Sequence, residues 1–524
     1  MEVKVEAEVR STDNVTGRAQ PLQAVVKPRN VDEVLQLVRE ARERRVPLYP
    51  VSTGLNWGYG SASPVRGAAT LVDLSEMRTI RNAERINVDH PVALIEPGVT
   101  QGQLSDFLAE RCPQLSFNVT GSARDTSILG NALDRGVGYL GPRRDDVFGL
   151  EVVTGTAELL RTGFRRLGDE SPLAQAHPYG LGPMMDGLFF QGNFGIVTSA
   201  CFRLLPRAER SVAVSLALRD EARLAELIDV LLRLKRQGVM SGVTHIGNRA
   251  RTQASLMAGI SDYLSRSCGV PPGRLADEAR AVLDRVAPFE WTSLGGISGT
   301  RGMVSAALAE VRRQVGKLAR VTVVDDAKLS VGFGLLHPLR RWPWARANAA
   351  AIAAIRPLHG LADGRPTDAA ISNLLWRFGR ADAPARELDA SDCGLIFVNP
   401  ALPMDGRSVV KAAAGMQAVA AGFGHALYMT LNIETTTSLV AVINLLFDRT
   451  DAAAVENAHA CARALWDYVR SMGLEVYRAR ADMMQDLVDA NDPFWRKAWE
   501  LKTVFDPDNL IAPGRYNLAQ APQS

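Results

Sequence analysis

Residues 50–73 of the 524-residue chain read PVSTGLNWGYGSASPVRGAATLVD, and they decide how its N-terminal part is organised. The extended run 46–51 leads into this stretch and contains two prolines. Because proline has no N–H for a strand ladder, we expect this run at the edge of a sheet. Polar residues begin at Ser52, and an apolar strand resumes at Ala69. The pattern therefore predicts a strand, a loop and a second strand.

The loop between these strands consists of glycine and small polar residues. It reads Ser52-Thr53-Gly54-Leu55-Asn56, followed by Trp57-Gly58-Tyr59-Gly60. Successive backbone N–H groups in such a loop form a concave nest for an anion, and glycine lets the main chain approach that anion closely. The loop has neither the GxxxxGK[ST] nor the GxGxxG pattern. A diphosphate-binding loop is one interpretation, and an ordinary turn-rich hairpin is the other.

Length and composition indicate an ordinary globular protein with two or three domains. Hydrophobic residues make up 47% of the chain and charged residues 22%. The formal net charge of +3 is too small to indicate nucleic acid or a membrane surface as a partner. The five scattered cysteines contain no CxxC pair, which indicates a reducing compartment and predicts neither a metal site nor a disulfide framework.

We expect a cytoplasmic protein. The N-terminal sequence MEVKVEAEVRSTDN is charged and lacks the apolar core of a signal peptide. The longest apolar run, 439–447, is interrupted by Asn444 and suits a buried strand better than a membrane helix.

Apolar periodicity divides the chain near residue 209. Before it, a strand at 24–26, a helix capped by Asn30, and the strands at 46–51 and 69–72 predict a small α/β unit. After it, strand and helix patterns alternate and predict a second, α+β domain in which helices back an antiparallel sheet.

Two further segments of the chain carry specific expectations. The segment 118–138, NVTGSARDTSILGNALDRGVG, is long for an idle loop, so we interpret it either as a second ligand-facing loop or as an irregular connection. Within the second domain, we expect a strand at 239–243 and a helix over 302–319.

Several longer motifs occur in one order along the chain. They are STGLNWGYGSASP (52–64), LIEPGVT (94–100), ILGNALDRGVGY (128–139), HPYGLGPMMDGLFFQGNFGIVT (177–198) and FDPDNLIAPGRY (505–516). With these motifs, the chain resembles the vanillyl-alcohol oxidase / p-cresol methylhydroxylase family of FAD-dependent flavoproteins. The resemblance implies an α+β fold with a two-subdomain FAD-binding PCMH-type domain (1–208), a cap domain with an antiparallel sheet (209–472), and a C-terminal segment (473–524) that returns to the FAD domain.

The resemblance also implies which residues hold FAD. Main-chain amides of the first loop would bind the diphosphate, the second loop would run beside the flavin, and one strand would lie along the adenosine or ribityl part. The residues expected at the cofactor are Ser52, Thr53, Gly54, Leu55, Asn56, Gly58, Tyr59, Ser122, Ile128, Asn131, Gly138, Ile196, Val197 and Arg515.

The chemistry that the resemblance implies is oxidation of a small 4-substituted phenol. A phenol held as its phenolate pushes electrons towards the para substituent, so the benzylic carbon can lose a hydride to flavin N5 and leave a p-quinone methide. Hydrogen-bond donors and a cation stabilise the phenolate. Tyr59, Tyr477 and Arg478 match the residues that do this in the family, and Tyr139 is expected near the ring. Otherwise, Tyr59 would be a packing aromatic and Arg478 a surface arginine.

Two departures from the family pattern matter. The position at which many relatives link the flavin covalently is Leu395 here, which cannot form that bond. Cys393 faces the same side of the expected strand, where a thiol linkage or a buried structural cysteine is conceivable. We predict FAD that is not covalently bound. Ser122 stands where some oxidases have an acidic residue, and we expect Glu434 to act as the base instead, unless it is only a solvated or salt-bridged residue.

Several functions stay open at this point. The first is a phenol oxidase with O2 as acceptor. The main alternative is oxidative decarboxylation of a tyrosine-derived (4-hydroxyphenyl) carboxylic acid to a vinyl phenol or enamide, for which Arg143, Arg144 or Arg365 would anchor the carboxylate. A dehydrogenase with a cytochrome acceptor and a catalytically idle FAD scaffold are the others. A homodimer is the oligomer that the resemblance suggests.

Overall fold

The N-terminal sheet is built around the stretch at residues 50–73. The structure, a computed structural model, describes residues 5–6, 12–374 and 384–522. Four strands lie in the order β1-β2-β4-β3, in which β4 runs parallel to both β2 and β3. Their bounds are β1 (Val5–Glu6), β2 (Leu22–Val26), β3 (Leu48–Val51) and β4 (Ala69–Asp73).

Helix α1 (Val31–Arg44) connects β2 to β3, and its sequence fixes both of its ends. The Asn30 side chain accepts a hydrogen bond from the Glu33 N–H as N-cap, and the helix stops at Arg45, whose φ of 56° lies in the left-handed region. Strand β3 lies at the edge of the sheet, as its prolines predict. The expected helix and edge strand are both confirmed.

A second, antiparallel sheet follows in the order β5-β9-β7-β8. Its strands are β5 (Val92–Ile95), β7 (Val147–Thr154), β8 (Leu159–Arg161) and β9 (Gly195–Arg203). Helices α2 (Gln101–Arg111) and α3 (Ile128–Leu133) add to its apolar core. The region 118–138 is therefore not loop throughout, because it contains the short helix α3.

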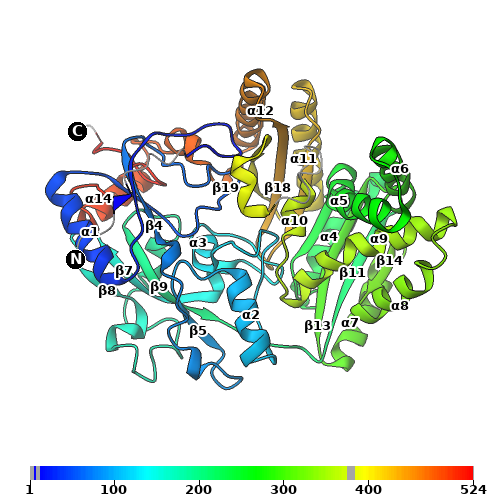
Figure 1. Cartoon of the computed structure of the whole chain (residues 1–524), viewed down its shortest axis with the longest axis horizontal. Coiled ribbons are helices and arrows are strands. Elements are labelled where there is room, and N and C mark those ends of the chain that lie inside the picture. Colours follow the sequence, from blue (N-terminus) through cyan, green and yellow to red (C-terminus); the bar gives the residue numbers. More distant parts are fainter. Residues whose placement is uncertain (1–4, 7–11, 375–383, 523–524) are drawn as a thin grey trace.

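The third sheet is the largest and is antiparallel. Its main path is β14-β11-β13-β12-β17-β18-β16-β19, and β15 also pairs with β18. The strands are β11 (Arg210–Leu218), β12 (Thr244–Asn248), β13 (Trp291–Gly299), β14 (Ala319–Val324), β15 (Cys393–Phe397), β16 (Asn399–Leu402), β17 (Tyr428–Ile433), β18 (Leu439–Asp448) and β19 (Val476–Arg478). In Figure 1 most of this sheet lies to the right of the two N-terminal sheets.

Two groups of helices pack against the third sheet. The first group shares one large apolar core with alternate residues of the strands, such as Leu431 and Ile443. These helices are α4 (Leu224–Arg236), α7 (Arg301–Val315), α11 (Gly406–Gly422) and α12 (Ala452–Ser471). The second group packs together in a separate core, and its helix α5 contacts β12 and β17. This group comprises α5 (Arg249–Cys268), α6 (Pro272–Val286), α8 (Asp326–Leu336) and α9 (Pro343–His359).

Two predicted elements of this region need correction. Residues 239–243 do not form a strand, because Gly238 turns the chain at a φ of 72° after α4 and Met240 packs into the helix core; the strand β12 begins at Thr244. The helix expected over 302–319 ends at Val315, and Ala319 already belongs to β14.

The C-terminal segment returns to the N-terminal half. After β19 pairs with β16, α14 (Pro493–Phe505) leads to a parallel bridge between Ile511 and Leu48 of β3. The C-terminus and α14 therefore lie beside α1 in Figure 1. The other described short helices are α10 (Ala369–Ser372) and α13 (Met484–Leu487).

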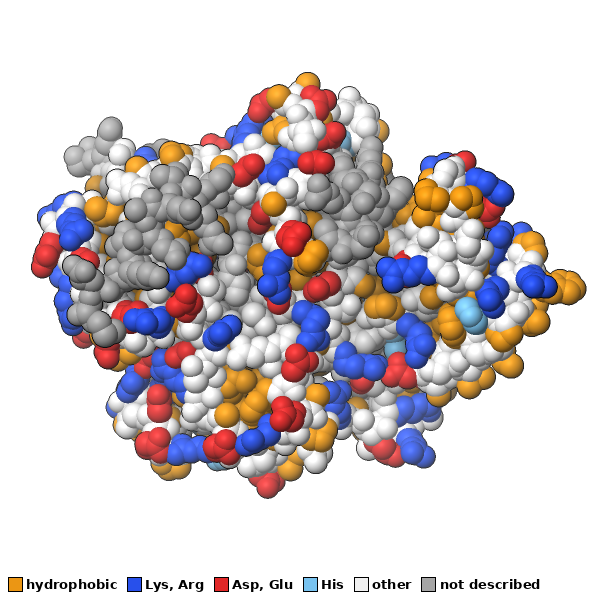
Figure 2. Space-filling model, in the orientation of Figure 1, with side chains coloured by type: hydrophobic (Ala, Val, Ile, Leu, Met, Phe, Trp, Pro, Cys, Tyr) orange, Lys and Arg blue, Asp and Glu red, His pale blue; other side chains and the backbone are white. Residues whose placement is uncertain are grey.

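The surface carries mixed charge. On the face shown in Figure 2, Lys and Arg side chains alternate with Asp and Glu side chains over both halves. In the described ranges, no helix combines the length and apolar character needed to cross a membrane.

A buried ion pair anchors the C-terminal segment. The Lys502 side chain is fully buried, and its Nζ donates to Asp506 Oδ2 (2.6 Å), to the Ile511 carbonyl (2.8 Å) and to the Asn193 carbonyl. Burial lowers the pKa of Lys502 to about 8, so the carboxylate of Asp506 is needed to keep this cation favourable.

We expect Asp506→Asn to destabilise the protein by about 3–5 kcal/mol, because it leaves the Lys502 cation buried without its partner. Thermal unfolding measures the effect. Glu500→Gln is a matched control on the same helix, since it removes the exposed partner of Lys497 and should cost less than about 1 kcal/mol. Equal losses in the two variants would contradict the role given to the buried pair.

Candidate active site

One large cavity, with a volume of about 360 Å³, lies where the N-terminal sheets, the third sheet and the C-terminal segment meet. Its lining includes the loop after β3, the region 120–139, Thr430 and Asn432 on β17, and the end of β19. Segments that are far apart in the sequence thus share one site.

The first loop offers the cavity a row of free amides. Among the described residues, none accepts a hydrogen bond from the backbone N–H groups of residues 53–58. Gly54 has a φ of 72°, in the left-handed region that glycine adopts without strain. Residues 53–57 line the cavity, and unpaired N–H groups beside a cavity suit an anionic group such as a diphosphate. The loop therefore fits the phosphates of FAD.

Gly58 plays a packing role in this loop. It has a φ of 75°, and a Cβ at this position would lie 2.2 Å from Cδ2 of Phe397. Gly58 is not part of the cavity lining, whereas Ser52, Thr53, Leu55 and Asn56 are. Glycine here lets the loop close onto the third sheet.

Of the residues expected at the cofactor from the second region and from β9, only some line the cavity. Ser122, Asn131 and Val197 line it. Ile128 and Ile196 are instead buried in two different apolar cores, and Gly138 packs so tightly that a Cβ would lie 2.0 Å from Asn118 Oδ1. These three residues lie outside the lining.

A cluster of aromatic rings and an arginine lies in the part of the cavity wall that β19 contributes to. The ring of Tyr59 stacks on Phe397, with centroids 5.1 Å apart and planes at 10°, and the Arg478 guanidinium lies 4.1 Å from the Tyr59 centroid. Asn399 Nδ2 donates to the Tyr59 hydroxyl. Tyr477 lines the same cavity and also interacts with Asn399. The structure therefore brings the three predicted phenol-binding residues together.

Asp134 holds the cation of this cluster in place. Arg478 Nε donates to Asp134 Oδ2 (2.7 Å), and Arg515 Nη2 donates to Asp134 Oδ1 (2.9 Å). Arg515 Nη1 donates in turn to the Tyr49 hydroxyl (2.9 Å). The sequence analysis did not predict Asp134 or Asn399 as site residues. The signals that could have indicated them were the acidic residue within the motif at 128–139 and the asparagine that precedes Pro400.

Burial sets the protonation of the cluster. It raises the pKa of Tyr59 to about 12, although Arg478 opposes this shift, and it raises the pKa of Tyr477 well above its usual value, with the help of Tyr59 and Glu434. Burial alone would lower the pKa of Arg478, but Asp134 and the tyrosines outweigh it and raise that pKa. Both tyrosines therefore keep their hydroxyl protons at neutral pH beside a permanent cation.

Glu434 directly follows β17, two residues after the cavity residue Asn432, but it does not itself line the cavity. Burial raises its pKa to about 7. Its Oε2 accepts a hydrogen bond from Ser438 Oγ (2.8 Å), and its Oε1 has no partner among the described residues. Glu434 is therefore a buried acid next to the site rather than a solvated surface residue.

Ser122 and Tyr139 lie elsewhere on the cavity wall. The Ser122 hydroxyl is within 2.5 Å of Thr120 Oγ1 and accepts from Gln101 Nε2 (3.1 Å). The Tyr139 ring packs against the ring of His245, with centroids 4.8 Å apart. Burial raises the pKa of Tyr139, which Arg251 opposes. His245 and Arg251 line the cavity too and were both missed from the sequence.

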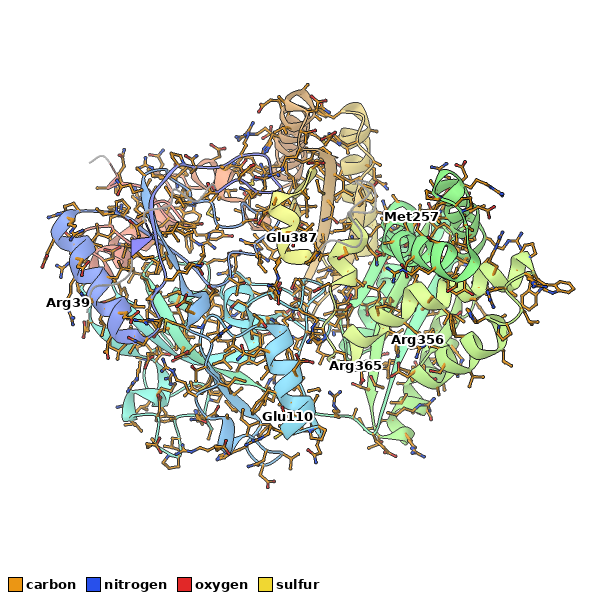
Figure 3. The ribbon with its side chains drawn as sticks, in the orientation of Figure 1. Arg39, Glu110, Met257, Arg356, Arg365 and Glu387 are labelled. Carbon is orange, nitrogen blue, oxygen red and sulfur yellow. The ribbon has the colours of Figure 1, made fainter. Side chains whose placement is uncertain are left out.

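The three arginines expected to anchor a carboxylate lie outside the cavity lining. Arg143 is buried and donates to the Asn118 carbonyl and to Gln101, while the Arg144 guanidinium covers the ring of Phe190. Arg365, labelled in Figure 3, is exposed and donates to Asp326 (2.6 Å). Each guanidinium thus contacts other parts of the protein, although Arg143 Nη1 has no hydrogen-bond partner among the described residues, and none of the three arginines is placed to hold a carboxylate in the cavity.

The possible covalent linkage sites lie behind the cavity. Leu395 is buried in an apolar cluster with Trp57, and Cys393 is buried in the same cluster. Burial raises the pKa of the Cys393 thiol far above its usual value, which disfavours the reactive thiolate. Neither residue is part of the cavity lining.

Comparisons with known proteins agree with this site. Residues 21–163 match the family described as FAD binding domain. The chain is 31% identical to 1'-carboxy-chondrochloren decarboxylase of Chondromyces crocatus, over 94% of this chain and 90% of that protein. It is 28% identical to the 4-cresol dehydrogenase (hydroxylating) flavoprotein subunit of Pseudomonas putida, over 94% of this chain and 87% of that protein.

Solved structures share the fold over nearly the whole chain. The structure of p-cresol methylhydroxylase with substrate bound covers 97% of this chain, with a TM-score of 0.78 at 24% identity and 92% of that chain covered. The isoeugenol complex of 4-ethylphenol oxidase from Gulosibacter chungangensis covers 98% of this chain and 92% of its own, with a TM-score of 0.79 at 23% identity.

The fold, the loop of unpaired amides at the cavity and the similarity to known flavoproteins agree. The protein is an FAD-dependent oxidoreductase with a PCMH-type FAD-binding domain. The chain belongs to the vanillyl-alcohol oxidase / p-cresol methylhydroxylase family.

We expect acid precipitation of the purified protein to release FAD into the supernatant, because Leu395 cannot form a flavin bond and Cys393 is a buried neutral thiol. Absorbance of the supernatant and flavin fluorescence of the protein band on a denaturing gel measure this. A pellet or band that keeps the flavin would contradict non-covalent binding.

Proposed function

We propose that this enzyme oxidises a small para-substituted phenol by removing a hydride from the benzylic carbon, which leaves a p-quinone methide. The observation that carries the proposal is the cluster of Tyr59, Tyr477 and Arg478 in one cavity with the amide-lined loop. FAD, when bound, supplies the two-electron acceptor for the hydride.

The cluster is suited to binding a phenol as its phenolate. The hydroxyls of Tyr59 and Tyr477 are protonated at neutral pH and can donate hydrogen bonds to the phenolic oxygen, and the guanidinium of Arg478 supplies the cation. A phenol normally ionises near pH 10, and donors together with a nearby cation lower that pKa. The phenolate then pushes electron density to the para carbon, so that the benzylic hydride leaves more easily.

Relatives support this class of substrate. The names of two of them, 4-cresol dehydrogenase and 4-ethylphenol oxidase, specify para-alkylphenols. O2 is the acceptor that we propose for the reduced enzyme, with a cytochrome as the alternative. Rapid mixing of the reduced enzyme with air separates them, because fast reoxidation supports an oxidase.

Oxidative decarboxylation is the second candidate for the overall reaction. A serine at position 122 cannot take a proton at neutral pH, whereas loss of CO2 from the quinone methide requires no base to activate water. The relative named as a decarboxylase matches 94% of this chain. Both candidates begin with the same hydride transfer and differ in the substituent on the para side chain.

We expect Tyr59→Phe to slow anaerobic flavin reduction by 4-ethylphenol by about 100-fold, since it removes one donor to the phenolate and keeps the stack on Phe397. Stopped-flow absorbance of the flavin measures the rate. Tyr468→Phe serves as control because the Tyr468 hydroxyl donates to the Lys411 carbonyl of the cap and is not part of the cavity lining, so its rate should match wild type. An unchanged rate in Tyr59→Phe, or no bleaching of the wild type by any para-alkylphenol, would argue against the proposal.

The base proposed for water addition to the quinone methide is Glu434. Its pKa is raised to about 7, so it is protonated below this pH and able to accept a proton above it. We expect formation of the alcohol product to rise through pH 7 in the wild type and to lose this inflection in Glu434→Gln. Ser438→Ala removes a hydrogen bond that favours the ionised form, so the inflection should move to higher pH. Identical profiles in all three proteins would exclude Glu434 as the base.

A further inference from the structure

Arg251 is a cation in the cavity without a counter-ion from the described protein. It stands in the first turn of α5, the helix on which Met257 is labelled in Figure 3, and it lines the cavity. Its Nη1 is shielded from solvent and has no hydrogen-bond partner, and its guanidinium pairs with no carboxylate in the described ranges. The Arg251 side chain is half-buried, and partial withdrawal from water lowers its pKa, which is the effect expected of a cation without a paired carboxylate.

The other two arginines in the cavity wall, Arg478 and Arg515, have a carboxylate partner. Arg478 and Arg515 share the two oxygens of Asp134. Asp134 is the sole carboxylate among the described lining residues, and it is fully engaged by that pair. A charge withdrawn from water is costly unless it is paired, so the pocket around Arg251 favours an anion that the protein does not supply.

The neighbours of Arg251 supply no competing charge. Burial lowers the pKa of His245 to about 4, so its imidazole is neutral at neutral pH. Its Nδ1 lies 2.9 Å from Asn432 Oδ1, while its Nε2 has no partner among the described residues. The Tyr139 ring packs beside it at an interplanar angle of 48°. Arg251 is therefore the charged group at this part of the cavity lining, and the nearby His245 Nε2 has unused hydrogen-bonding capacity.

We propose that Arg251 binds a carboxylate on the para side chain of the substrate, so that the enzyme takes (4-hydroxyphenyl)alkanoic acids in which the carboxylate lies one carbon beyond the benzylic position. This inference rests on the proposed phenol oxidation, which places the phenolate at Tyr59, Tyr477 and Arg478. Arg251 takes over the role that the sequence gave to Arg143, Arg144 or Arg365.

Such a substrate can complete an oxidative decarboxylation. The benzylic C–H bond breaks and its electron pair leaves as a hydride to the two-electron acceptor, FAD, while a phenolate electron pair forms the exocyclic double bond of the quinone methide. The bond to the carboxylate then breaks, and its electron pair forms the side-chain double bond as the ring returns to the phenolate. CO2 leaves, and the products are a 4-vinylphenol and reduced FAD, which O2 reoxidises to give hydrogen peroxide.

In this scheme Arg251 contributes to substrate binding more than to cleavage of the bond to the carboxylate. An ion pair stabilises the carboxylate but not neutral CO2, so Arg251 cannot speed the loss of CO2 by pairing with its precursor. The expected signature is a change in substrate affinity, with little change in the limiting rate of flavin reduction.

The contact between Arg251 and the carboxylate can be measured without turnover by a pair of ligands that cannot donate a benzylic hydride. (4-Hydroxyphenoxy)acetate has an ether oxygen in place of the benzylic carbon and keeps the carboxylate, and 4-methoxyphenol lacks the carboxylate. We expect Arg251→Gln in the FAD-loaded protein to weaken (4-hydroxyphenoxy)acetate by about 10- to 100-fold in calorimetric titrations and to leave 4-methoxyphenol unchanged. Arg251→Lys should recover part of the loss.

Arg249→Gln is the matched control, because Arg249 lies two residues earlier on α5 and pairs at the surface with Asp284 and Glu290. It should bind both ligands as the wild type does. Equal affinity of wild type and Arg251→Gln for the carboxylate ligand would overturn the inference, as would an equal loss in the Arg249 variant.

Anaerobic flavin bleaching separates this failure from failure of the proposed function. If 4-ethylphenol bleaches the flavin but Arg251→Gln binds carboxylate ligands as tightly as the wild type, the carboxylate site is wrong and the proposed phenol oxidation still holds. No bleaching by either 4-ethylphenol or 3-(4-hydroxyphenyl)propanoate would overturn both. Mass spectrometry of the propanoate reaction should show loss of CO2 together with two hydrogen atoms, and loss of two hydrogen atoms alone would contradict the decarboxylation step.

Discussion

The carboxylate of Asp134 is the interaction on which the site depends. Its two oxygens accept from Arg478 on β19 and from Arg515 near the C-terminus, while Asp134 itself follows helix α3 in the N-terminal half. One anion thus fixes two cations from segments that return from the third sheet. Two positive charges against one negative charge leave the cluster with an excess of one, and a phenolate beside Tyr59 is the group that would balance it.

The two faces of the third sheet divide structural and chemical roles. On one face, residues such as Leu431 and Ile443 complete an apolar core with four helices. On the other face, the alternate residues Thr430 and Asn432 of β17 reach the cavity. Because the side-chain period of a strand is two, a shift by one residue would exchange these roles, so the buried core also fixes which polar groups the substrate meets.

The elements and loops whose own residues carry a strong signal could be predicted from the sequence. The edge strand β3, the cap of α1 and the loop of free amides follow from prolines, Asn30 and glycines close to one another in the chain. The contacts that complete the site are long-range: Asp134 and Arg478 are 344 residues apart, and no local pattern indicates such a partner. Arg143 illustrates the same limit, since it occurs in a polar turn of the sequence but is fully buried against Asn118. With 60 lysines and arginines in the chain, only the fold distinguishes a free guanidinium from a paired one.

The unequal pairing of the cavity arginines also bears on turnover. With a substrate that is anionic at both ends, the cluster at Tyr59 and the unpaired Arg251 would each gain a partner on binding. Loss of the hydride converts the phenolate into a neutral quinone methide. Loss of CO2 then restores the negative charge of the phenolate and removes the carboxylate that was paired with Arg251. The product would then keep its contact with Arg478 but lose the one with Arg251, and would bind less tightly than the substrate. A cation that the protein leaves uncompensated thereby favours both capture of the acid and release of the vinylphenol.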